Sequence, residues 1–325
     1  MKCAEEKRTL RAMFDALPRE VSIVEVSLRD GLQNEAKFVS TEHKLELVRG
    51  LYRAGMRRME LTSFVKPEWI PQLADAEALC DAVGLGPSSG TPGAGEFLGA
   101  TFSALCPNER GWERARTTKL PELAVFLSAS ETHNQKNTNK SIADSIELYG
   151  RIVPEMLREG RRVRGYVSTV WGCPYEGDVP EKQVARLVET LLSLGCFEVS
   201  LGDTIGCGTP VQTKKVLAEV GHFSQIAMHM HDTRGTALAN ILVGLEYGVK
   251  VFDASTGGLG GCPYAAGASG NVATEDLVFL LDGMGVRSGL TLEGLLEVGR
   301  RSAELLSRGQ ESHLAKAGPF VTLQK

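Results

Sequence analysis

Residues 225–232 read Gln225-Ile226-Ala227-Met228-His229-Met230-His231-Asp232, an apolar run that closes on two histidines two positions apart. In a strand, successive side chains point to opposite faces and the chain rises ~3.3 Å per residue. His229 and His231 therefore point the same way, about 6.6 Å apart at Cα, which suits two ligands of one metal ion. Burial of one or both rings as ordinary core residues is the alternative. The run predicts a strand that ends in a candidate metal site.

Seven further strand-type runs accompany this one, and helix-type stretches lie between them. The eight runs span residues 21–28, 58–63, 100–105, 123–129, 163–170, 197–201, 225–230 and 249–254. The amphipathic stretches carry start and stop signals, such as Ser40-Thr41 before one of them and Gly55 after it. Eight β/α units in about 250 residues predict an α/β fold, the TIM (β/α)8 barrel. An open doubly wound sheet is the rival, but no G-x-G-x-x-G follows the first run.

The domain organisation follows from the same alternation. We expect one barrel domain over residues 21–285, an N-terminal helical extension over 1–20 and a C-terminal helical extension over 286–325. Residues 84–95 are rich in Gly, Pro and Ser and predict a long loop rather than a linker, because the alternation resumes after them. Residues 290–308 predict one more amphipathic helix, which leaves no room for a second domain.

Composition excludes several classes of protein. The 325 residues are 42% hydrophobic and 23% charged with a net charge of -4, so we expect a large core and no nucleic-acid partner. The charged start and the lack of 18 consecutive apolar residues predict no signal peptide, no membrane partner and a cytoplasmic location. The seven cysteines form no C-x-x-C pair, which argues against a disulfide framework and a thiolate zinc site.

Polar residues recur where the predicted strands end, and a TIM barrel gathers its functional groups at that rim. Besides the two histidines, the candidates are Arg29, Asp30, Glu60, Asp203, Cys262 and Asn271. Each has a structural alternative: a surface ion pair for Arg29 with Asp30, an arginine partner in the barrel for Glu60, and a helix cap for Asp203. Gathered in one barrel mouth, however, the charges would need a cation or a substrate to compensate them.

Longer motifs resemble the hydroxymethylglutaryl-CoA lyase family from about Val21 to Gly285. They are Glu25-Val26-Ser27-Leu28-Arg29-Asp30-Gly31-Leu32-Gln33-Asn34-Glu35, Thr62-Ser63-Phe64-Val65, Arg164-Gly165-Tyr166-Val167-Ser168, Gly172-Cys173-Pro174-Tyr175-Glu176-Gly177, Ser200-Leu201-Gly202-Asp203-Thr204-Ile205-Gly206, His229-Met230-His231-Asp232 and Gly258-Leu259-Gly260-Gly261-Cys262-Pro263-Tyr264-Ala265. A wider superfamily of metal-dependent lyases and Claisen-type synthases shares the Arg-Asp-Gly and His-x-His elements. The Gly-Gly-Cys-Pro-Tyr loop singles out the lyase.

The resemblance implies a retro-Claisen cleavage of an acyl-CoA thioester, 3-hydroxy-3-methylglutaryl-CoA, to acetyl-CoA and acetoacetate, with a place in leucine degradation and ketone body metabolism. It implies Mg²⁺ or Mn²⁺ as cofactor, with zinc not excluded. The implied metal ligands are Asp30, His229, His231 and Asn271. The implied catalytic residues are Arg29, Asp30, Cys262, Glu60, Asp203 and His229.

Within that set, Arg29 would stabilise the enolate oxygen and the Cys262 thiol would protonate the enolate or take part in that relay. Asp30 or a neighbouring group would take the hydroxyl proton, and the sequence does not decide between them. Glu60 and Asp203 would act from a second layer or in a base relay, and Gln33 would contact the substrate. The segment 130–140 either presents donors such as Lys136 and Asn137 to coenzyme A or is a solvated loop.

Several positions depart from the family pattern and leave the substrate open. The departures are Ser27-Leu28, His133 and Trp171, and many lyases have Gly-Pro in place of Ser27-Leu28. We expect all of these positions to border the acyl pocket. A related 3-hydroxy-3-alkylglutaryl-CoA or another hydroxyacyl-CoA is therefore an alternative substrate. A condensing synthase of the isopropylmalate or citramalate type is a second alternative, although the Cys262 loop has the lyase form. A catalytically inactive binding barrel is a third, although no implied ligand is missing. A homodimer is possible by analogy with other barrels.

Overall fold

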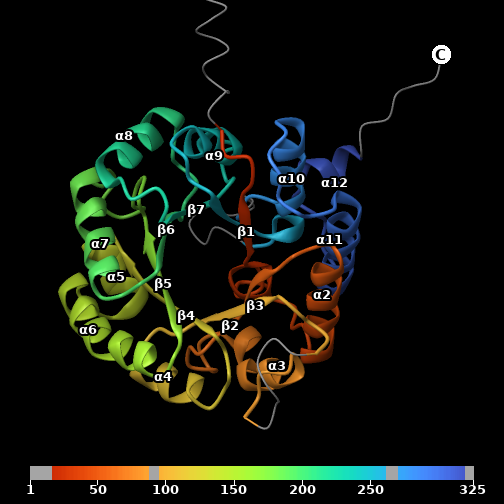
Figure 1. Ribbon diagram of the computed structural model, residues 1–325, viewed down its shortest axis with the longest axis horizontal. Coiled ribbons are helices and arrows are strands. Elements are labelled where there is room, and N and C mark those ends of the chain that lie inside the picture. Colours follow the sequence, from red (N-terminus) through yellow and green to blue (C-terminus); the bar gives the residue numbers. More distant parts are fainter. Residues whose placement is uncertain (1–16, 88–94, 261–269, 319–325) are drawn as a thin grey trace, which may run out of the picture.

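Eight parallel strands close into a barrel in the computed structural model, which describes residues 17–87, 95–260 and 270–318 (Figure 1). Each strand pairs with its neighbours in chain order, and β8 pairs with β1. The strands are β1 (Ser22–Glu25), β2 (Arg58–Ser63), β3 (Thr101–Leu105), β4 (Glu122–Ser128), β5 (Arg162–Ser168), β6 (Glu198–Asp203), β7 (Ile226–Met230) and β8 (Val251–Ala254). The predicted TIM barrel and all eight predicted strand runs are confirmed.

Helices surround the strands and cover the outer face of the barrel (Figure 1). They are α2 (Thr41–Arg53), α3 (Ala76–Ala82), α4 (Glu109–Ala115), α5 (Glu131–Thr138), α6 (Ile142–Arg158), α7 (Glu181–Ser193), α8 (Pro210–Val220), α9 (Ala237–Glu246), α10 (Thr274–Gly283), α11 (Leu292–Leu306) and α12 (His313–Ala317). Their starts follow from local chemistry: the hydroxyls of Ser40 and Thr209 accept backbone N–H groups at the first turns of α2 and α8.

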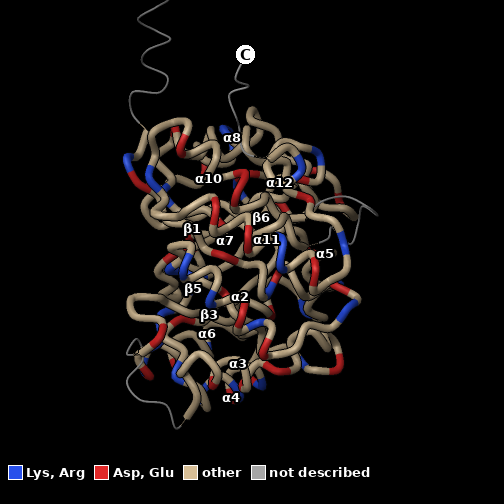
Figure 2. Tube along the Cα trace, turned by 90° about the vertical axis from the view of Figure 1, so that its right-hand side faces the viewer, with Lys and Arg blue, Asp and Glu red and all other residues tan. Residues whose placement is uncertain are grey.

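The apolar faces of these helices pack on the strands and form the core. In α7, for example, Val184, Leu187, Val188 and Leu191 recur at helical spacing and are all buried. No helix in the described part of the chain is long and apolar enough to span a membrane. Basic and acidic positions are mixed over the height of the molecule, as expected from its small net charge (Figure 2).

Two segments differ from the expectation. The first strand ends at Glu25, because Ser27–Gly31 form a π-helical turn, η1, in which the Gly31 N–H bonds to the Val26 carbonyl. Segment 130–140, for which a solvated loop was one of two alternatives, contains helix α5, which the Ser130 hydroxyl caps by accepting the His133 N–H.

The two ends of the chain are only partly described. The expected N-terminal extension over 1–20 lies mostly outside the described residues, and so do residues 88–94 of the Gly-rich loop. The C-terminal segment contains α11, which lies beside α2 in Figure 1, and the short α12.

Charged side chains, rather than branched apolar ones alone, fill part of the barrel interior. Arg164 of β5 bonds to Glu198 of β6 and with two nitrogens to Asp253 of β8. Glu198 also pairs with Arg58 of β2. Arg164, Glu198 and Asp253 are buried and Arg58 is partly buried, and these four side chains are named here the interior ion ladder.

Candidate metal centre and active site

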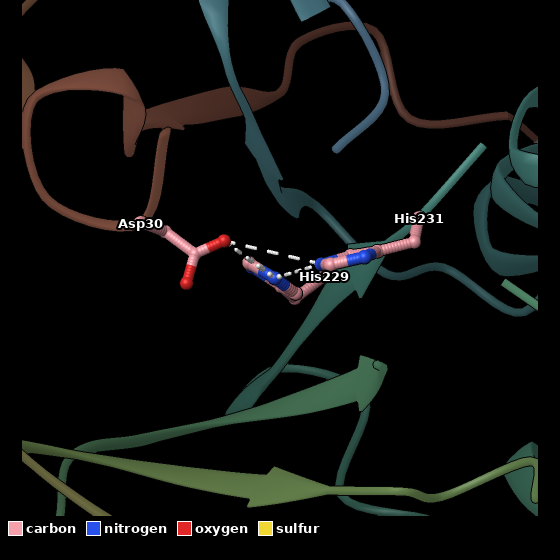
Figure 3. Close-up of side chains that lie close together, drawn as sticks. All are labelled: Asp30, His229 and His231. Carbon is pink, nitrogen blue, oxygen red and sulfur yellow. Dashed lines mark hydrogen bonds and ion pairs between the residues drawn. The ribbon is translucent and has the colours of Figure 1, made fainter. Parts of the chain in front are cut away.

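His229, His231 and Asp30 meet at the carboxyl ends of the strands (Figure 3). His229 lies in β7 and His231 immediately follows it, and the two side chains lie on the same side, as the spacing predicts. Their Nε2 atoms are 3.2 Å apart, and Asp30 Oδ2 lies 3.8 Å from the first and 3.9 Å from the second. The π-helical turn η1 delivers Asp30, and Gly31 lets this turn approach residues 255–259: a Cβ there would lie 2.9 Å from atoms of Ser255 and Leu259.

Asn271 completes the arrangement. It forms an isolated bridge with His231, and its amide nitrogen donates to Asp30 Oδ2 at 2.7 Å and to the Leu259 carbonyl. Its Oδ1 is buried and accepts no hydrogen bond within the described ranges. One carboxylate oxygen and two imidazole nitrogens thus converge, with the Asn271 amide against the carboxylate, and side chains of these types fit a divalent cation.

The charge states of these groups also fit a cation. Burial alone would raise the pKa of Asp30, but Arg29 and the two histidines outweigh it and lower the pKa to about 2. Burial, with His229 beside it, lowers the pKa of His231 to about 4. At neutral pH the carboxylate is therefore ionised and the His231 ring is neutral, which are the forms that bind metal.

Arg29 is fixed by two carboxylates. Its Nε donates to Glu60 at 2.7 Å and its Nη1 to Asp30 at 2.6 Å. Burial raises the pKa of Glu60, although Arg29 opposes this shift. Burial also disfavours the charged form of Arg29, but Glu60 and Asp30 outweigh it and keep the pKa of Arg29 above its usual value. Glu60 is therefore an arginine partner, as its structural alternative supposed. Arg29 and Asp30 do form an ion pair, but the pair is largely buried at the site rather than on the surface.

A cavity of about 360 Å³ opens beside this cluster. The candidate residues Arg29, Gln33, Asn137, His229 and His231 line it. The other lining residues include Ser63, Val65, Trp69, Ile70, Leu105, Pro107, Asn108, Phe126, Thr138, Lys140, Tyr149, Tyr166, Ser168, Gly202 and Thr204. The lining thus combines the polar cluster with apolar side chains such as Leu105 and Phe126. Gln33 also donates to Asp30 Oδ1 at 3.0 Å.

Two further candidates, Asp203 and Lys136, are described but do not line the cavity. Asp203 is buried and accepts the backbone N–H groups of Cys207 and Gly208, so it holds the loop that precedes α8. The Lys136 ammonium lies 4.8 Å from the centre of the Tyr175 ring rather than in the cavity lining. Cys262 lies outside the described residues.

The expected position of the unusual residues was wrong. Ser27, Leu28, His133 and Trp171 are all described, and none of them lines the cavity. Trp171 instead packs at Gly208, where an added Cβ would lie 2.9 Å from the indole. These substitutions therefore supply no argument for a different acyl group.

Sequence reasoning missed the polar residues beneath the site. Tyr166 lines the cavity, and its hydroxyl lies between Arg164 Nη1 at 2.7 Å and Glu60 Oε2 at 3.3 Å. Asp253 lies 3.3 Å from His229 Nδ1. A signal was available, because Arg164 and Tyr166 alternate with apolar residues along one strand and so share its inner face.

Together, fold and site define a (β/α)8-barrel protein with a candidate divalent-metal centre at the carboxyl ends of its strands. Residues 20–301 match the family described as HMGL-like, and the chain belongs to this family. It is 46% identical over 294 residues to hydroxymethylglutaryl-CoA lyase YngG of Bacillus subtilis, covering 90% of this chain and 95% of that one.

Two further relatives are informative. The 3-hydroxy-3-isohexenylglutaryl-CoA/hydroxymethylglutaryl-CoA lyase of Pseudomonas aeruginosa is 43% identical, with 93% of this chain and 98% of that one covered. A solved HMG-CoA lyase from Acinetobacter baumannii, in complex with coenzyme A and 3-methylmalate, superposes with a TM-score of 0.84 at 37% identity, covering 94% and 98% of the two chains. The resemblance inferred from the motifs is confirmed.

Proposed function

We propose that this chain is a carbon–carbon lyase that cleaves 3-hydroxy-3-methylglutaryl-CoA to acetyl-CoA and acetoacetate. The observation that carries the proposal is the convergence of Asp30, His229, His231 and Asn271 beside a cavity, in a chain 46% identical to a hydroxymethylglutaryl-CoA lyase. Acetoacetate as product would place the reaction in leucine degradation and ketone body metabolism.

The four converging residues would hold Mg²⁺ or Mn²⁺. Asp30 and Asn271 supply oxygen atoms, and His229 and His231 supply nitrogen atoms. A dication held there supplies Lewis-acid polarisation of the substrate oxygens. Zinc also accepts these ligands, but a mixed oxygen and nitrogen set without thiolates suits the harder ions.

Arg29 would bind the thioester carbonyl and stabilise the negative charge that develops on it. Cleavage transfers the bonding electron pair to the departing acetyl unit, whose thioester oxygen becomes an enolate oxygen. Arg29 lines the cavity and keeps its charge, and Glu60 and Asp30 fix its orientation through Nε and Nη1. A preorganised planar cation of this kind stabilises the transition state more than the ground state.

Two proton transfers complete the reaction: the tertiary hydroxyl loses a proton and the enolate carbon gains one. With a pKa of about 2, Asp30 is a weak base unless a neighbour shares the task. We assign Glu60 to a second layer or a base relay beside Arg29, His229 to the site of hydroxyl binding, and Asp203 to support of the loop after β6. Gln33 and Asn137 would contact the substrate. Lys136, on the same helix as Asn137, would act at longer range on the coenzyme A phosphates.

The Cys262 thiol would protonate the enolate carbon, by resemblance to the family. We expect Cys262→Ala to lower kcat by at least ~10²-fold, as loss of a proton-transfer group does, while bound metal stays unchanged. Unaltered turnover in this variant would remove the role assigned to the thiol.

The proposal as a whole is tested with purified protein, Mg²⁺ or Mn²⁺ and a panel of thioesters. The panel contains 3-hydroxy-3-methylglutaryl-CoA, longer 3-alkyl homologues and a simple 3-hydroxyacyl-CoA, with acetyl-CoA and the keto acid quantified by mass spectrometry. We expect cleavage of the methyl compound that chelator abolishes and metal restores. Selective cleavage of a longer homologue would show that this homologue, rather than the methyl compound, is the substrate. No cleavage of any member would overturn the proposal.

We also propose a homodimer, by analogy with barrels that pair through outer helices. Light scattering measures the molecular mass in solution and so tests this proposal.

A further inference from the structure

Asp253 lies directly beneath one of the candidate ligands. Its Oδ2 is 3.3 Å from Nδ1 of His229, on the side of the ring opposite the Nε2 that faces Asp30 and His231. The residue sits in β8, next to β7 in the barrel, where Cα pairing sets it opposite His229. It is fully buried, and no part of the site described above depends on it.

The carboxylate is held rigidly by the interior ion ladder. Arg164 donates to Asp253 Oδ1 at 2.7 Å and to Oδ2 at 3.1 Å, and the Ser200 hydroxyl donates to Oδ2 at 2.9 Å. Three donors thus meet the two carboxylate oxygens, the arrangement expected of a carboxylate that accepts hydrogen bonds and donates none.

Because the Asp253 carboxylate only accepts hydrogen bonds, it restricts which form of His229 can face it. The ring nitrogen next to Asp253 must carry hydrogen to form a hydrogen bond, so a neutral His229 has its proton on Nδ1 and a lone pair on Nε2. Nε2 of His229 faces His231 and Asp30 (Figure 3). The second histidine differs: Nδ1 of His231 is buried and has no partner within the described ranges.

We propose that Asp253 is a positioning residue that fixes the tautomer and ring orientation of His229, so that Nε2 is preset to bind the divalent cation. The inference rests on the proposed metal-dependent function. Partners of this kind typically contribute ~10–100-fold to metal affinity, because they remove the rotation and the wrong tautomer that binding would otherwise have to correct.

The first experiment reads the tautomer directly, without metal. The chain has six histidines, so nitrogen NMR of protein labelled with ¹⁵N-histidine is assignable with single His-to-Gln variants. In the wild-type protein we expect His229 to show a protonated Nδ1 and an unprotonated Nε2, and this pattern to weaken in Asp253→Asn. A wild-type spectrum with the proton on Nε2 overturns the inference even if no variant folds.

The second experiment measures Mn²⁺ affinity by electron paramagnetic resonance in the wild type, Asp253→Asn and a matched control, Glu198→Gln. Glu198 bonds to the same Arg164 at 2.7 Å and to Arg58, so the control disturbs the same buried ladder away from His229. We expect Asp253→Asn to weaken binding ~10–100-fold and Glu198→Gln to leave it within ~3-fold of wild type. Equal affinity in Asp253→Asn, or an equal loss in both variants, overturns the inference.

These outcomes separate the inference from the proposed function. If the wild-type protein bound no Mn²⁺ and cleaved no thioester, the proposed function would fail and the inference with it. If the wild-type protein bound Mn²⁺ and Asp253→Asn bound it equally well, only the inference about Asp253 would fail.

Discussion

His231 offers the sharpest single-residue test of the metal centre. The residue is 5% exposed, and its Nε2 faces His229 and Asp30. We expect His231→Ala to reduce bound Mn²⁺ at least ~10-fold, because one of four ligands is lost. Equilibrium dialysis with metal analysis measures the effect. His222→Ala, at an exposed histidine paired with Glu189, is the matched control and should bind metal normally. A normal metal content in the His231 variant would contradict the ligand assignment.

At this scale the sequence predicted the residues that project from strand ends and missed those that face each other across the barrel. The common position of Asp30, His229, His231 and Asn271 followed from the rule that parallel strands end at one rim. The contact between Arg164 and Asp253 joins positions 89 residues apart within the interior, and a single strand's pattern does not say which partner lies opposite. Residue spacing along a strand indicates which way a side chain points, whereas the partner that it contacts depends on how the strands close into the barrel.

Among the elements, the segment that follows β8 supports the ligand Asn271. Gly260 has a φ of +108°, and a Cβ there would lie 2.6 Å from the Asn271 amide nitrogen. We expect Gly260→Ala to strain the backbone by about 1 kcal/mol and also to displace Asn271, which weakens Mn²⁺ binding about 10-fold. Gly285→Ala is the control, since its φ is +71° and no atom lies within 4 Å of the added carbon. Calorimetric titration should show a change in affinity for the first variant alone.

The start of α10 carries a pH-dependent element of stability. Burial raises the pKa of Glu275 to about 7, with Asp276 and Glu25 adding to the effect, although the Gly257 N–H opposes it. Because the unfolded side chain titrates near 4.5, the folded state retains a proton between pH 4.5 and 7 that the unfolded state has released. The stabilisation is complete below pH 4.5 and is lost as pH rises through 7, by up to about 3 kcal/mol.

Glu275→Gln should therefore be more stable than the wild type at pH 8, and the difference should vanish toward pH 5. Gln keeps an oxygen that can accept the Gly257 N–H and carries no charge to bury. Urea unfolding at several pH values measures the difference. Glu293→Gln, at an exposed position in the first turn of α11, is the control. A parallel pH dependence in wild type and Glu275→Gln would rule out this origin.

The elements also show where pattern reasoning stops. Periodicity predicted α7 and α11, whose apolar faces are strong, and it failed for α5, whose buried residues are His133 and Asn134. Asn134 fixes that helix through polar contacts: its Oδ1 accepts the Ser128 N–H and its amide donates to the Lys140 carbonyl. A helix held by hydrogen bonds rather than by an apolar stripe leaves no hydrophobic period to detect.

For the whole molecule, metal binding and folding should be linked. The four proposed ligands come from η1, from β7 and the segment after it, and from the segment before α10, so the closed barrel is what brings these segments to one place. A cation that binds only the folded state adds about 2.7 kcal/mol to the free energy of unfolding when its concentration is 100 times the Kd. We expect Mn²⁺ to raise the melting temperature by several degrees in scanning calorimetry and His231→Ala to abolish the rise. An equal rise in that variant would locate the ion elsewhere.

The fold as a whole was the most predictable level. Eight alternations of strand and helix satisfy the barrel's requirement that every strand pair on both sides, and chain order then determines which strands are neighbours. The π-helical turn η1 was not predictable from the hydrophobic period, because the apolar run continues past the end of β1. The turn that carries Arg29 and Asp30 therefore begins inside the predicted strand.

The interior ion ladder also limits how such a chain can diverge. Removing one residue of a buried ion pair leaves its partner as an uncompensated buried charge, which costs about 3–5 kcal/mol of stability. Replacing both residues of the pair by apolar residues of similar volume is nearly neutral. Homologous sequences should therefore change Arg58, Glu198, Arg164 and Asp253 in concert or not at all. Libraries that randomise these four positions one at a time should return mostly destabilised proteins, and libraries that vary them jointly should include members with the stability of the wild type.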